Sequence, residues 1–271
     1  MFHKTIQLSD KFPGATLTTY VSYDPAELKM PPRRAIIVCP GGGYHFLSDR
    51  EAEPIVKYYL AAGLNVFLLR YTVGAGAANY APLIEASLAI KHVREHAPEY
   101  NIDPKYVFIC GFSAGGHLAA STGTLWNIPE VRAEMADAPE NINRPTGMIL
   151  CYPVLIYSHK RSFYNLCGTE TPTPEQIDCF SLEKHVTPDT PPTFMWHTFS
   201  DKTVDVQNVL TFAQKLKDNG VPFELHIFPE GKHGLSLATE ETCSGNPEML
   251  VPHVRPWADL SVKWIKDFKA D

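Results

Sequence analysis

Ser113 has the sequence context of a nucleophile. It lies in the sequence GFSAG, directly after the apolar run Tyr106–Cys110 and before a segment typical of a helix. A sharp strand-to-helix turn exposes a serine hydroxyl, and the N–H groups at a helix N-terminus favour developing negative charge. Side chains beside such a turn would collide, and Gly111 and Gly115 avoid that collision. The pattern predicts attack by Ser113 on an acyl carbon, whereas the alternative, a glycine-rich turn in an ordinary Rossmann-like sheet, predicts no matching acid and base downstream.

A serine nucleophile needs a base that takes its proton and an acid that orients the base. The apolar run that begins at Thr193 leads to Asp201, at the carboxyl end of a predicted strand, where open α/β sheets assemble their sites. Asp205 is the alternative acid, but we expect it in the first turn of the following helix, interacting with the helix dipole. The sequence therefore predicts Asp201 as the acid.

Three histidines follow the predicted acid. His226 lies inside the run Phe223–Phe228 and is expected to be structural, and His253 lies in a stretch expected to be a surface loop. His233 lies in PEGKHG, the loop after the last predicted strand, where glycines let the chain turn the imidazole toward the top of the sheet. We therefore predict that His233 takes the Ser113 proton and returns it to the leaving group, with His253 as the alternative base.

Three glycines follow the apolar run Ala35–Cys39, in the sequence PGGGY. Backbone N–H groups that point at a developing oxyanion stabilise the transition state, and glycines let them approach closely. We predict an oxyanion hole formed by the N–H groups of Gly42, Gly43 and Ala114. The alternative is a phosphate-binding loop, but neither GK[ST] nor GxGxxG accompanies these glycines.

Tyr44 and His45 come directly after the glycines. Both could line a pocket for the acyl group. Alternatively, Tyr44 packs against the glycine loop and His45 faces solvent.

These candidate residues need a sheet that brings them together. Short runs rich in apolar residues predict strands covered on both faces, as in a parallel sheet. The runs are Ala35–Cys39, Asn65–Tyr71, Tyr106–Cys110, Gly147–Tyr152, Thr193–Trp196 and Phe223–Phe228. The predicted helices are Glu51–Ala62, Pro82–His96, Val204–Asn219 and Pro256–Phe268, and the segments Thr5–Ser9 and Ala15–Ser22 predict an antiparallel hairpin at the sheet edge. This alternation predicts one doubly wound, mostly parallel α/β sheet with helices on both faces.

Residues 154–192, here called the cap segment, interrupt the alternation. Six of the 23 prolines, at positions 153, 172, 174, 188, 191 and 192, lie in or beside this segment, which contains no clear strand. A connection of this length between two strands usually has a function, so we expect a small cap over the site. The alternative is a surface excursion with a short helix near Pro174–Phe180. Together with the cap segment, residues 1–271 are expected to form one domain.

Composition narrows the class of protein. Hydrophobic residues make up 44% of the chain and charged residues 20%, as in a globular protein, and no apolar run reaches the roughly 18 residues of a membrane span. The formal net charge is −6 without a basic cluster, so we expect neither nucleic acid nor a membrane as a partner. The six cysteines lack metal-ligand spacing and are expected as thiols, which, with no signal-peptide core near Met1, favours a cytoplasmic location. We expect no cofactor or metal, and the oligomeric state stays open, a homodimer included.

In the order PGGGY, GFSAGGH, HTFSD and GKHG, these motifs resemble those of the α/β-hydrolase serine esterases, in the branch of acetyl esterases, lipases and acetylxylan-esterase-like proteins. The resemblance extends over residues 34–237 and includes REAEPIVKYYLAAG and PPTFMWHTFSD. It implies an α/β-hydrolase fold with Ser113, Asp201 and His233 as the catalytic residues. Relatives of hormone-sensitive lipase have a histidine before the glycines, where this chain has Pro40, so the resemblance favours the bacterial carbohydrate-esterase-like group.

The leading hypothesis is a serine esterase that removes short acyl groups, acetyl above all, from small carbohydrates such as xylo-oligosaccharides through an acyl-enzyme. On the same fold, the alternatives are a generic short-chain esterase or lipase and an arylformamidase-like amide hydrolase. A peptidase would need a larger additional domain, and an interfacial lipase would need an apolar lid. A catalytically inactive binding protein is disfavoured, because such proteins lose members of the triad. The expected partner is a small-molecule ester.

Overall fold

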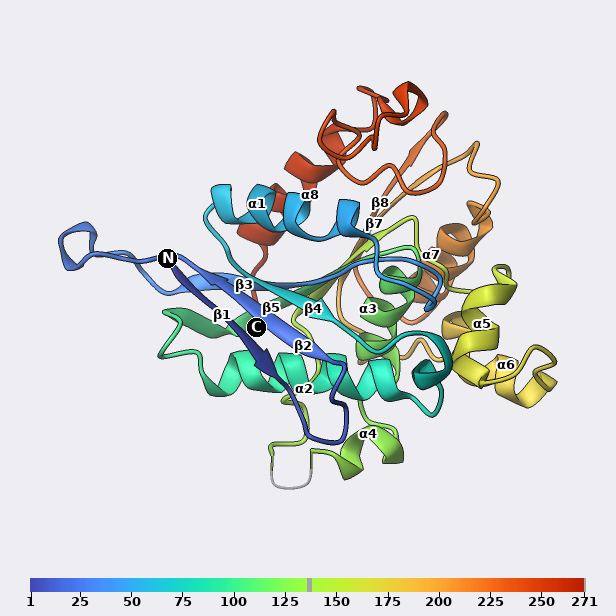
Figure 1. Ribbon diagram of the computed structural model, residues 1–271, viewed down its shortest axis with the longest axis horizontal. Coiled ribbons are helices and arrows are strands. Elements are labelled where there is room, and N and C mark those ends of the chain that lie inside the picture. The colour runs from blue at the N-terminus through green and yellow to red at the C-terminus, as the bar shows by residue number, and fades with distance from the viewer. Residues whose placement is uncertain (136–137, 271) are drawn as a thin grey trace.

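The chain folds around one eight-stranded sheet in the computed structural model, which describes residues 1–135 and 138–270 (Figure 1). The strands are β1 (Phe2–Gln7), β2 (Thr16–Val21), β3 (Arg33–Cys39), β4 (Asn65–Arg70), β5 (Ile102–Phe112), β6 (Gly147–Cys151), β7 (Thr193–Thr198) and β8 (Phe223–Phe228). Their order across the sheet is β1-β2-β4-β3-β5-β6-β7-β8. β2 pairs antiparallel with both β1 and β4, and the other neighbours pair parallel. The predicted strands and the predicted edge hairpin are therefore confirmed, with boundaries that differ by a few residues.

The helices begin where the sequence places helix-starting residues. They are α1 (Glu53–Ala61), α2 (Ala81–Glu95), α3 (Ala114–Thr124), α4 (Pro129–Ala133), α5 (Lys160–Cys167), α6 (Pro174–Phe180), α7 (Gln207–Asp218) and α8 (Pro256–Asp267). α1, α2, α4, α6 and α8 carry a proline in the first turn, where its missing N–H costs nothing and its fixed φ suits a helix. Part of the proline content therefore marks helix starts. No helix in the described ranges is long and apolar enough to cross a membrane.

Helices cover both faces of the sheet, as its apolar strands require. In β3, Ala35, Ile37 and Cys39 belong to one hydrophobic core, and Ile36 and Val38 belong to a second core on the other face. α2, α3 and α7 complete the first core, and α1 and α8 complete the second. In Figure 1, α1 and α8 lie above the sheet and α2 lies below it. The predicted doubly wound arrangement is therefore present.

The cap segment, residues 154–192, contains α5 and α6 between β6 and β7. α6 coincides with the short helix predicted at Pro174–Phe180, and a capping box stabilises its first turn. α5 was not predicted from the sequence, because KRSFYNLC is mostly polar and only Ser162, Phe163 and Leu166 are buried. In Figure 1 both helices lie beside α7, at the right-hand end of the molecule.

Candidate active site

Ser113 lies on the turn between β5 and α3 in a conformation that few residues adopt. Its φ is +53° and its ψ is −116°, and its N–H donates to the carbonyl of Cys151 at 2.9 Å. A Cβ on Gly111 would lie 1.9 Å from the carbonyl oxygen of Gly115, and a Cβ on Gly115 would lie 2.2 Å from the carbonyl oxygen of Cys39. Only glycine fits at either position, so the predicted tight turn is present and holds Ser113 at the carboxyl end of the central strands.

Ser113, His233 and Asp201 form a row of hydrogen bonds. Ser113 Oγ donates to His233 Nε2 at 2.7 Å, and His233 Nδ1 donates to Asp201 Oδ2 at 2.6 Å. The backbone N–H groups of Thr203 and Val204 donate to the other Asp201 oxygen at 2.8 and 3.1 Å. Burial alone would raise the pKa of Asp201, but the His233 contact and these two N–H groups outweigh it, and the pKa falls below its ordinary value. Because a carboxylate only accepts hydrogen bonds, it keeps a proton on Nδ1 and leaves Nε2 free to accept from Ser113.

The alternative acid, the alternative base and the histidine expected to be structural lie elsewhere. Asp205 accepts a hydrogen bond from a backbone N–H at the start of α7, at 2.7 Å, close to the helix-start position expected for it. His226 lies in β8, where its Nε2 donates to Glu224 at 2.7 Å. His253 is exposed on the chain before α8. The structure therefore brings together the three residues that the sequence predicted and neither alternative.

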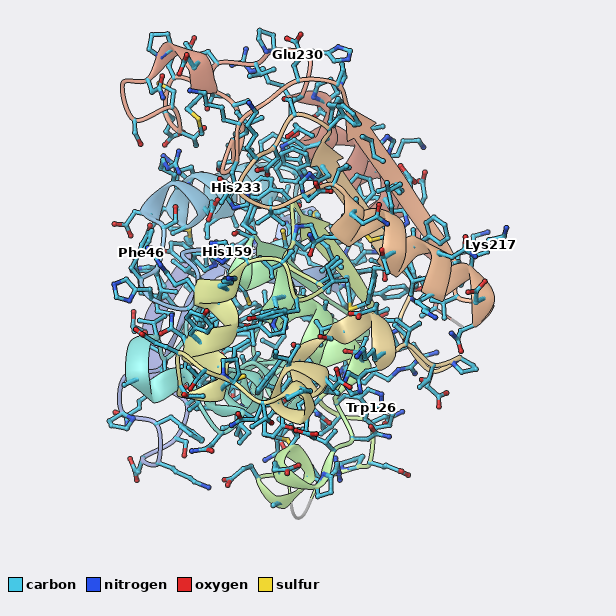
Figure 2. The ribbon with its side chains drawn as sticks, turned by 90° about the vertical axis from the view of Figure 1, so that its right-hand side faces the viewer. Phe46, Trp126, His159, Lys217, Glu230 and His233 are labelled. Carbon is cyan, nitrogen blue, oxygen red and sulfur yellow. The ribbon has the colours of Figure 1, made fainter. Side chains whose placement is uncertain are left out.

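A cavity of about 170 Å³, here called the Ser113 cavity, opens beside the serine. Its walls include Gly42, Gly43 and the exposed Phe46 (Figure 2). Within the described part of the chain, the N–H groups of Gly42 and Gly43 donate to no protein acceptor. Ala114, the third predicted donor, is the first residue of α3, where N–H groups have no partner within the helix. Two predicted oxyanion donors therefore line the same cavity as Ser113, and the third follows it directly.

Glu51, which no sequence motif predicted, connects the glycine loop to the histidine. Its carboxylate is buried; Oε2 accepts from the N–H of Gly41 at 2.8 Å, and Oε1 accepts from the hydroxyl of Tyr152 at 2.7 Å. The Tyr152 oxygen accepts from the N–H of Ser236 at 3.0 Å, and its ring packs edge-on against His233 with the centroids 5.1 Å apart. Burial, and then the charge of Glu51, raise the pKa of Tyr152 well above its usual range, so the phenol remains a donor. One buried carboxylate thus supports both the glycine loop and the base.

Tyr44 packs under the glycine loop and does not line the Ser113 cavity. Its hydroxyl donates to His117 Nδ1 at 2.9 Å, and His117 Nε2 donates to the carbonyl of Phe180 at 2.9 Å. Burial lowers the pKa of His117 to about 4, so this histidine is neutral and keeps that tautomer. His45 is exposed. For both residues after the glycines, the structure agrees with the packing and solvent alternatives, because neither lines the Ser113 cavity.

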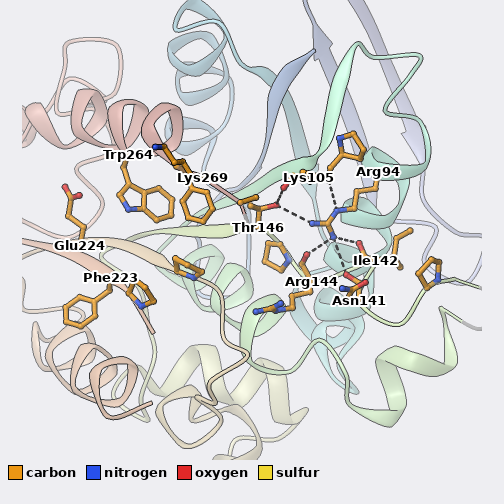
Figure 3. A pocket seen from close by; sticks show the side chains of 17 residues that line it. Arg94, Lys105, Asn141, Ile142, Arg144, Thr146, Phe223, Glu224, Trp264 and Lys269 are labelled. Atoms are coloured by element: carbon orange, nitrogen blue, oxygen red, sulfur yellow. Dashed lines mark hydrogen bonds between the residues drawn. The ribbon is translucent and has the colours of Figure 1, made fainter. Parts of the chain in front are cut away.

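A second cavity, of about 960 Å³, lies at the opposite end of the strands (Figure 3). Lys105, Thr146 and Phe223, near the amino ends of β5, β6 and β8, line it. Arg94 donates there to carbonyl groups of the loop before β6, so its guanidinium holds that loop. The described lining contains no serine, cysteine or histidine, so it offers no pair of nucleophile and histidine base. No group of three His, Cys, Asp or Glu residues in the described ranges could hold a metal ion.

The mostly parallel sheet, the serine turn and the later aspartate and histidine define the class of α/β-hydrolases. Residues 22–216 match the family described as BD-FAE, and the chain belongs to this family of α/β-hydrolases. A solved structure of an acetyl ester-xyloside bifunctional hydrolase from Caldicellulosiruptor lactoaceticus is 36% identical with a TM-score of 0.77, and the match covers 93% of this chain and 87% of that chain. The fold and the resemblance predicted from the motifs are therefore confirmed.

Two curated relatives are larger than this chain. Endo-1,4-beta-xylanase B from Butyrivibrio fibrisolvens is 37% identical over 219 residues, which are 79% of this chain and 34% of that protein. Acetylxylan esterase from Xylanibacter ruminicola is 31% identical over 217 residues, which are 77% of this chain and 42% of that protein. The chain thus spans 34% to 42% of the length of these relatives. Family and fold thus make the chain an α/β-hydrolase, and its relatives include a protein named acetylxylan esterase.

Proposed function

We propose that the chain hydrolyses acetyl and other short acyl esters of small carbohydrates, with Ser113, His233 and Asp201 as its catalytic residues. The observation that carries this proposal is the row of two hydrogen bonds, 2.7 and 2.6 Å long, from the serine through the histidine to the carboxylate. A serine hydroxyl is a weak nucleophile until a base takes its proton, and this row supplies that base in an oriented form.

The reaction has two halves. Ser113 Oγ attacks the acyl carbon while His233 Nε2 takes its proton, and the Asp201 carboxylate stabilises the resulting imidazolium through Nδ1. The N–H groups of the glycine loop and of Ala114 stabilise the oxyanion. His233 then gives the proton to the departing alcohol, and a water molecule deprotonated by the same nitrogen releases the acid.

The size of the Ser113 cavity favours a short acyl group. At about 170 Å³ it is smaller than the roughly 300–1,000 Å³ pockets that hold drug-sized ligands, so a short acyl chain and part of the alcohol fill it. The names of two relatives, an acetylxylan esterase and an acetyl ester-xyloside bifunctional hydrolase, support an acetylated sugar as the substrate.

We also propose that the cap segment, residues 154–192, covers the site as part of one domain and helps select the alcohol portion. Asn165 of α5 donates to the carbonyl of Gly43 at 3.0 Å. The hydrogen bond from His117 to the carbonyl of Phe180 connects α3 to the end of α6. Both contacts support a cap that stays attached to the glycine loop and to the helix after the nucleophile.

The proposed location is the cytoplasm. All six cysteines are free, and free thiols persist where the compartment is reducing. Fractionation of the source cells beside a cytoplasmic marker enzyme tests this location, and recovery of the protein among secreted proteins would contradict it.

A substrate panel tests the proposed activity. The panel contains 4-nitrophenyl acetate, butyrate and octanoate and acetylated xylo-oligosaccharides. Ser113→Ala is the inactive variant, and Ser22→Ala, directly after β2, is the matched control. We expect the wild type and Ser22→Ala to cleave the acetate fastest and to release acetate from the sugars, and we expect Ser113→Ala to do neither. Equal, slow hydrolysis by wild type and Ser113→Ala would refute the esterase assignment. Rapid cleavage of aryl acetates without release of acetate from the sugars would refute the carbohydrate part and leave a generic short-chain esterase.

A further inference from the structure

Two arginines give the wall of the Ser113 cavity a positive charge. Arg50 lies in the short 3-10 helix Asp49–Glu51, Arg161 lies in the first turn of α5, and both line the cavity. The acidic residue of the described lining is Glu51, and its carboxylate is already bound by the two donors described above. A chain with a net charge of −6 thus carries positive charge at its candidate active site.

Neither guanidinium group has a partner among residues 1–135 and 138–270. Across the described ranges, the side chains of Arg50 and Arg161 form no hydrogen bond and no ion pair. Arg70, by contrast, binds Asp49, so the carboxylate next to Arg50 in the sequence is already paired. Glu170 lines a neighbouring hollow together with Arg161 but forms no ion pair with it. Both cations therefore remain available to a ligand.

Packing places the two side chains on different parts of the site. Arg161 Cδ lies 3.5 Å from the position of a Cβ on Gly43, so its stem covers the glycine loop. Arg50 Nη2 lies 3.1 Å from the position of a Cβ on Gly234, the residue after His233. One guanidinium group is thus near the predicted oxyanion donors, and the other is near the base.

His159 contributes no opposing or additional charge. It lines the same cavity, at the end of the molecule that also carries Phe46 and His233 (Figure 2). Burial, followed by the proximity of the His233 and Arg161 side chains, lowers the pKa of His159. Its imidazole is therefore neutral near pH 7, and the positive charge of this wall belongs to the arginines.

We propose that the Ser113 cavity selects esters whose alcohol portion carries a carboxylate, as an acidic sugar does, and that Arg50 and Arg161 bind this carboxylate. The inference rests on the proposed esterase function. A guanidinium group matches a carboxylate through two parallel N–H···O hydrogen bonds, which gives both affinity and orientation. The alcohol portion is the part concerned, because His233 protonates the leaving alcohol and Arg50 lies beside the residue that follows His233.

Two aryl acetates of similar size test this proposal. 4-Carboxyphenyl acetate carries the carboxylate in its alcohol portion, and 4-carbamoylphenyl acetate is its neutral counterpart. Each kcat/KM is divided by the rate of hydroxide-catalysed hydrolysis of the same ester, which removes differences in leaving-group reactivity. At low ionic strength we expect the wild type to prefer the anionic ester about tenfold or more, as one charge-assisted hydrogen bond provides. Added salt should reduce that preference, and this readout needs no substitution.

Variants assign the preference to residues. Arg50→Gln and Arg161→Gln should each lower the ratio of anionic to neutral rates about fivefold or more, because each removes one charged partner. Arg161→Lys should lower this ratio less, since lysine keeps the positive charge and loses only the planar guanidinium group that binds a carboxylate through two hydrogen bonds. Lys217→Gln removes a charge from α7, far from the cavity, and should keep the wild-type ratio (Figure 2). Thermal unfolding of each variant checks that it folds.

The outcomes separate this inference from the proposed function. A wild type that cleaves the neutral ester without preferring the anionic one overturns the inference and leaves the esterase proposal intact. A wild type that cleaves neither ester contradicts the proposed function itself. If 4-nitrophenyl hemisuccinate is preferred over 4-nitrophenyl butyrate while the two aryl acetates are cleaved equally, the carboxylate belongs to the acyl portion, and the inference as stated is wrong.

Discussion

Replacing Glu51 by glutamine should displace the glycine loop while leaving the three predicted catalytic residues unchanged. The groups that face the two carboxylate oxygens are both donors, the N–H of Gly41 at 2.8 Å and the hydroxyl of Tyr152 at 2.7 Å. A glutamine side chain has the same shape but offers one acceptor and one donor. In Glu51→Gln one of the two buried donors therefore faces another donor.

The size of the effect follows from these contacts. A hydrogen bond to a charged group contributes about 1.5–3 kcal/mol, and a buried donor without an acceptor costs about 1–3 kcal/mol. Glu51→Gln weakens one such bond and leaves one donor unpaired, so we expect a loss of about 2–4 kcal/mol in the free energy of unfolding. Complete loss of one oxyanion donor costs about 2.7–4 kcal/mol of transition-state stabilisation, and a displaced loop loses part of this, so kcat should fall about 10- to 100-fold.

The assay measures kcat on 4-nitrophenyl acetate together with urea unfolding. Glu85→Gln is the matched control, since Glu85 is also buried and accepts from the N–H of Thr72 at 2.7 Å, away from the Ser113 cavity. Burial raises the pKa of Glu85 to about 7, so this substitution removes less charge and should leave kcat unchanged. If Glu51→Gln loses stability but keeps the wild-type kcat, Glu51 does not position the loop, and the reasoning fails.

Three further predictions concern neighbouring groups. Asp201→Asn should lower kcat about 10⁴-fold, because the amide no longer keeps the proton on His233 Nδ1, and near-wild-type kinetics would contradict this. The pKa of Asp201 is lowered in the folded protein, so its carboxylate stabilises the fold at pH values above the pKa of the unfolded state. This contribution is lost as the pH falls through the pKa of the folded state. Urea titrations of Asp201→Asn at decreasing pH should therefore lack that part of the acid-induced loss of stability. His117 has a pKa of about 4 in the folded protein against an ordinary 6.5, so about 3 kcal/mol of the free energy of unfolding is lost as the pH falls from 6.5 to 4. In His117→Gln the free energy of unfolding should fall less over that range. The same dependence of this free energy on pH in wild type and variant would refute the assignment.

The predicted catalytic residues could be found from the sequence because each follows a run that is recognisable as a strand of the sheet. In a parallel sheet, the carboxyl ends of such strands meet at one edge, so Ser113, Asp201 and His233 had to lie near each other. Gly42 and Gly43 could be predicted for the same reason, since they follow β3. These inferences depend only on strand order and on local turn chemistry.

Glu51 could not be found in this way. One of its two partners, Gly41, lies ten residues before it, and the other, Tyr152, lies on the chain between β6 and the cap segment. Nothing local distinguishes Glu51 from Glu53, the other acidic residue of REAEP. The role of Tyr44 was equally undetermined, because the side of the loop on which a side chain packs depends on His117, far along the chain. α5 was missed because its few buried residues are spaced among polar ones, and packing rather than composition stabilises it.

The most direct test of the central claim is rapid-quench mass spectrometry of the wild type mixed with 4-nitrophenyl acetate. We expect one acetyl group on the protein within the burst of nitrophenol release, mapped by peptide sequencing to Ser113, and we expect no acetylated protein with Ser113→Ala. An acetyl group on another residue, or turnover by the wild type with no burst while Ser113→Ala remains as active, would contradict the account.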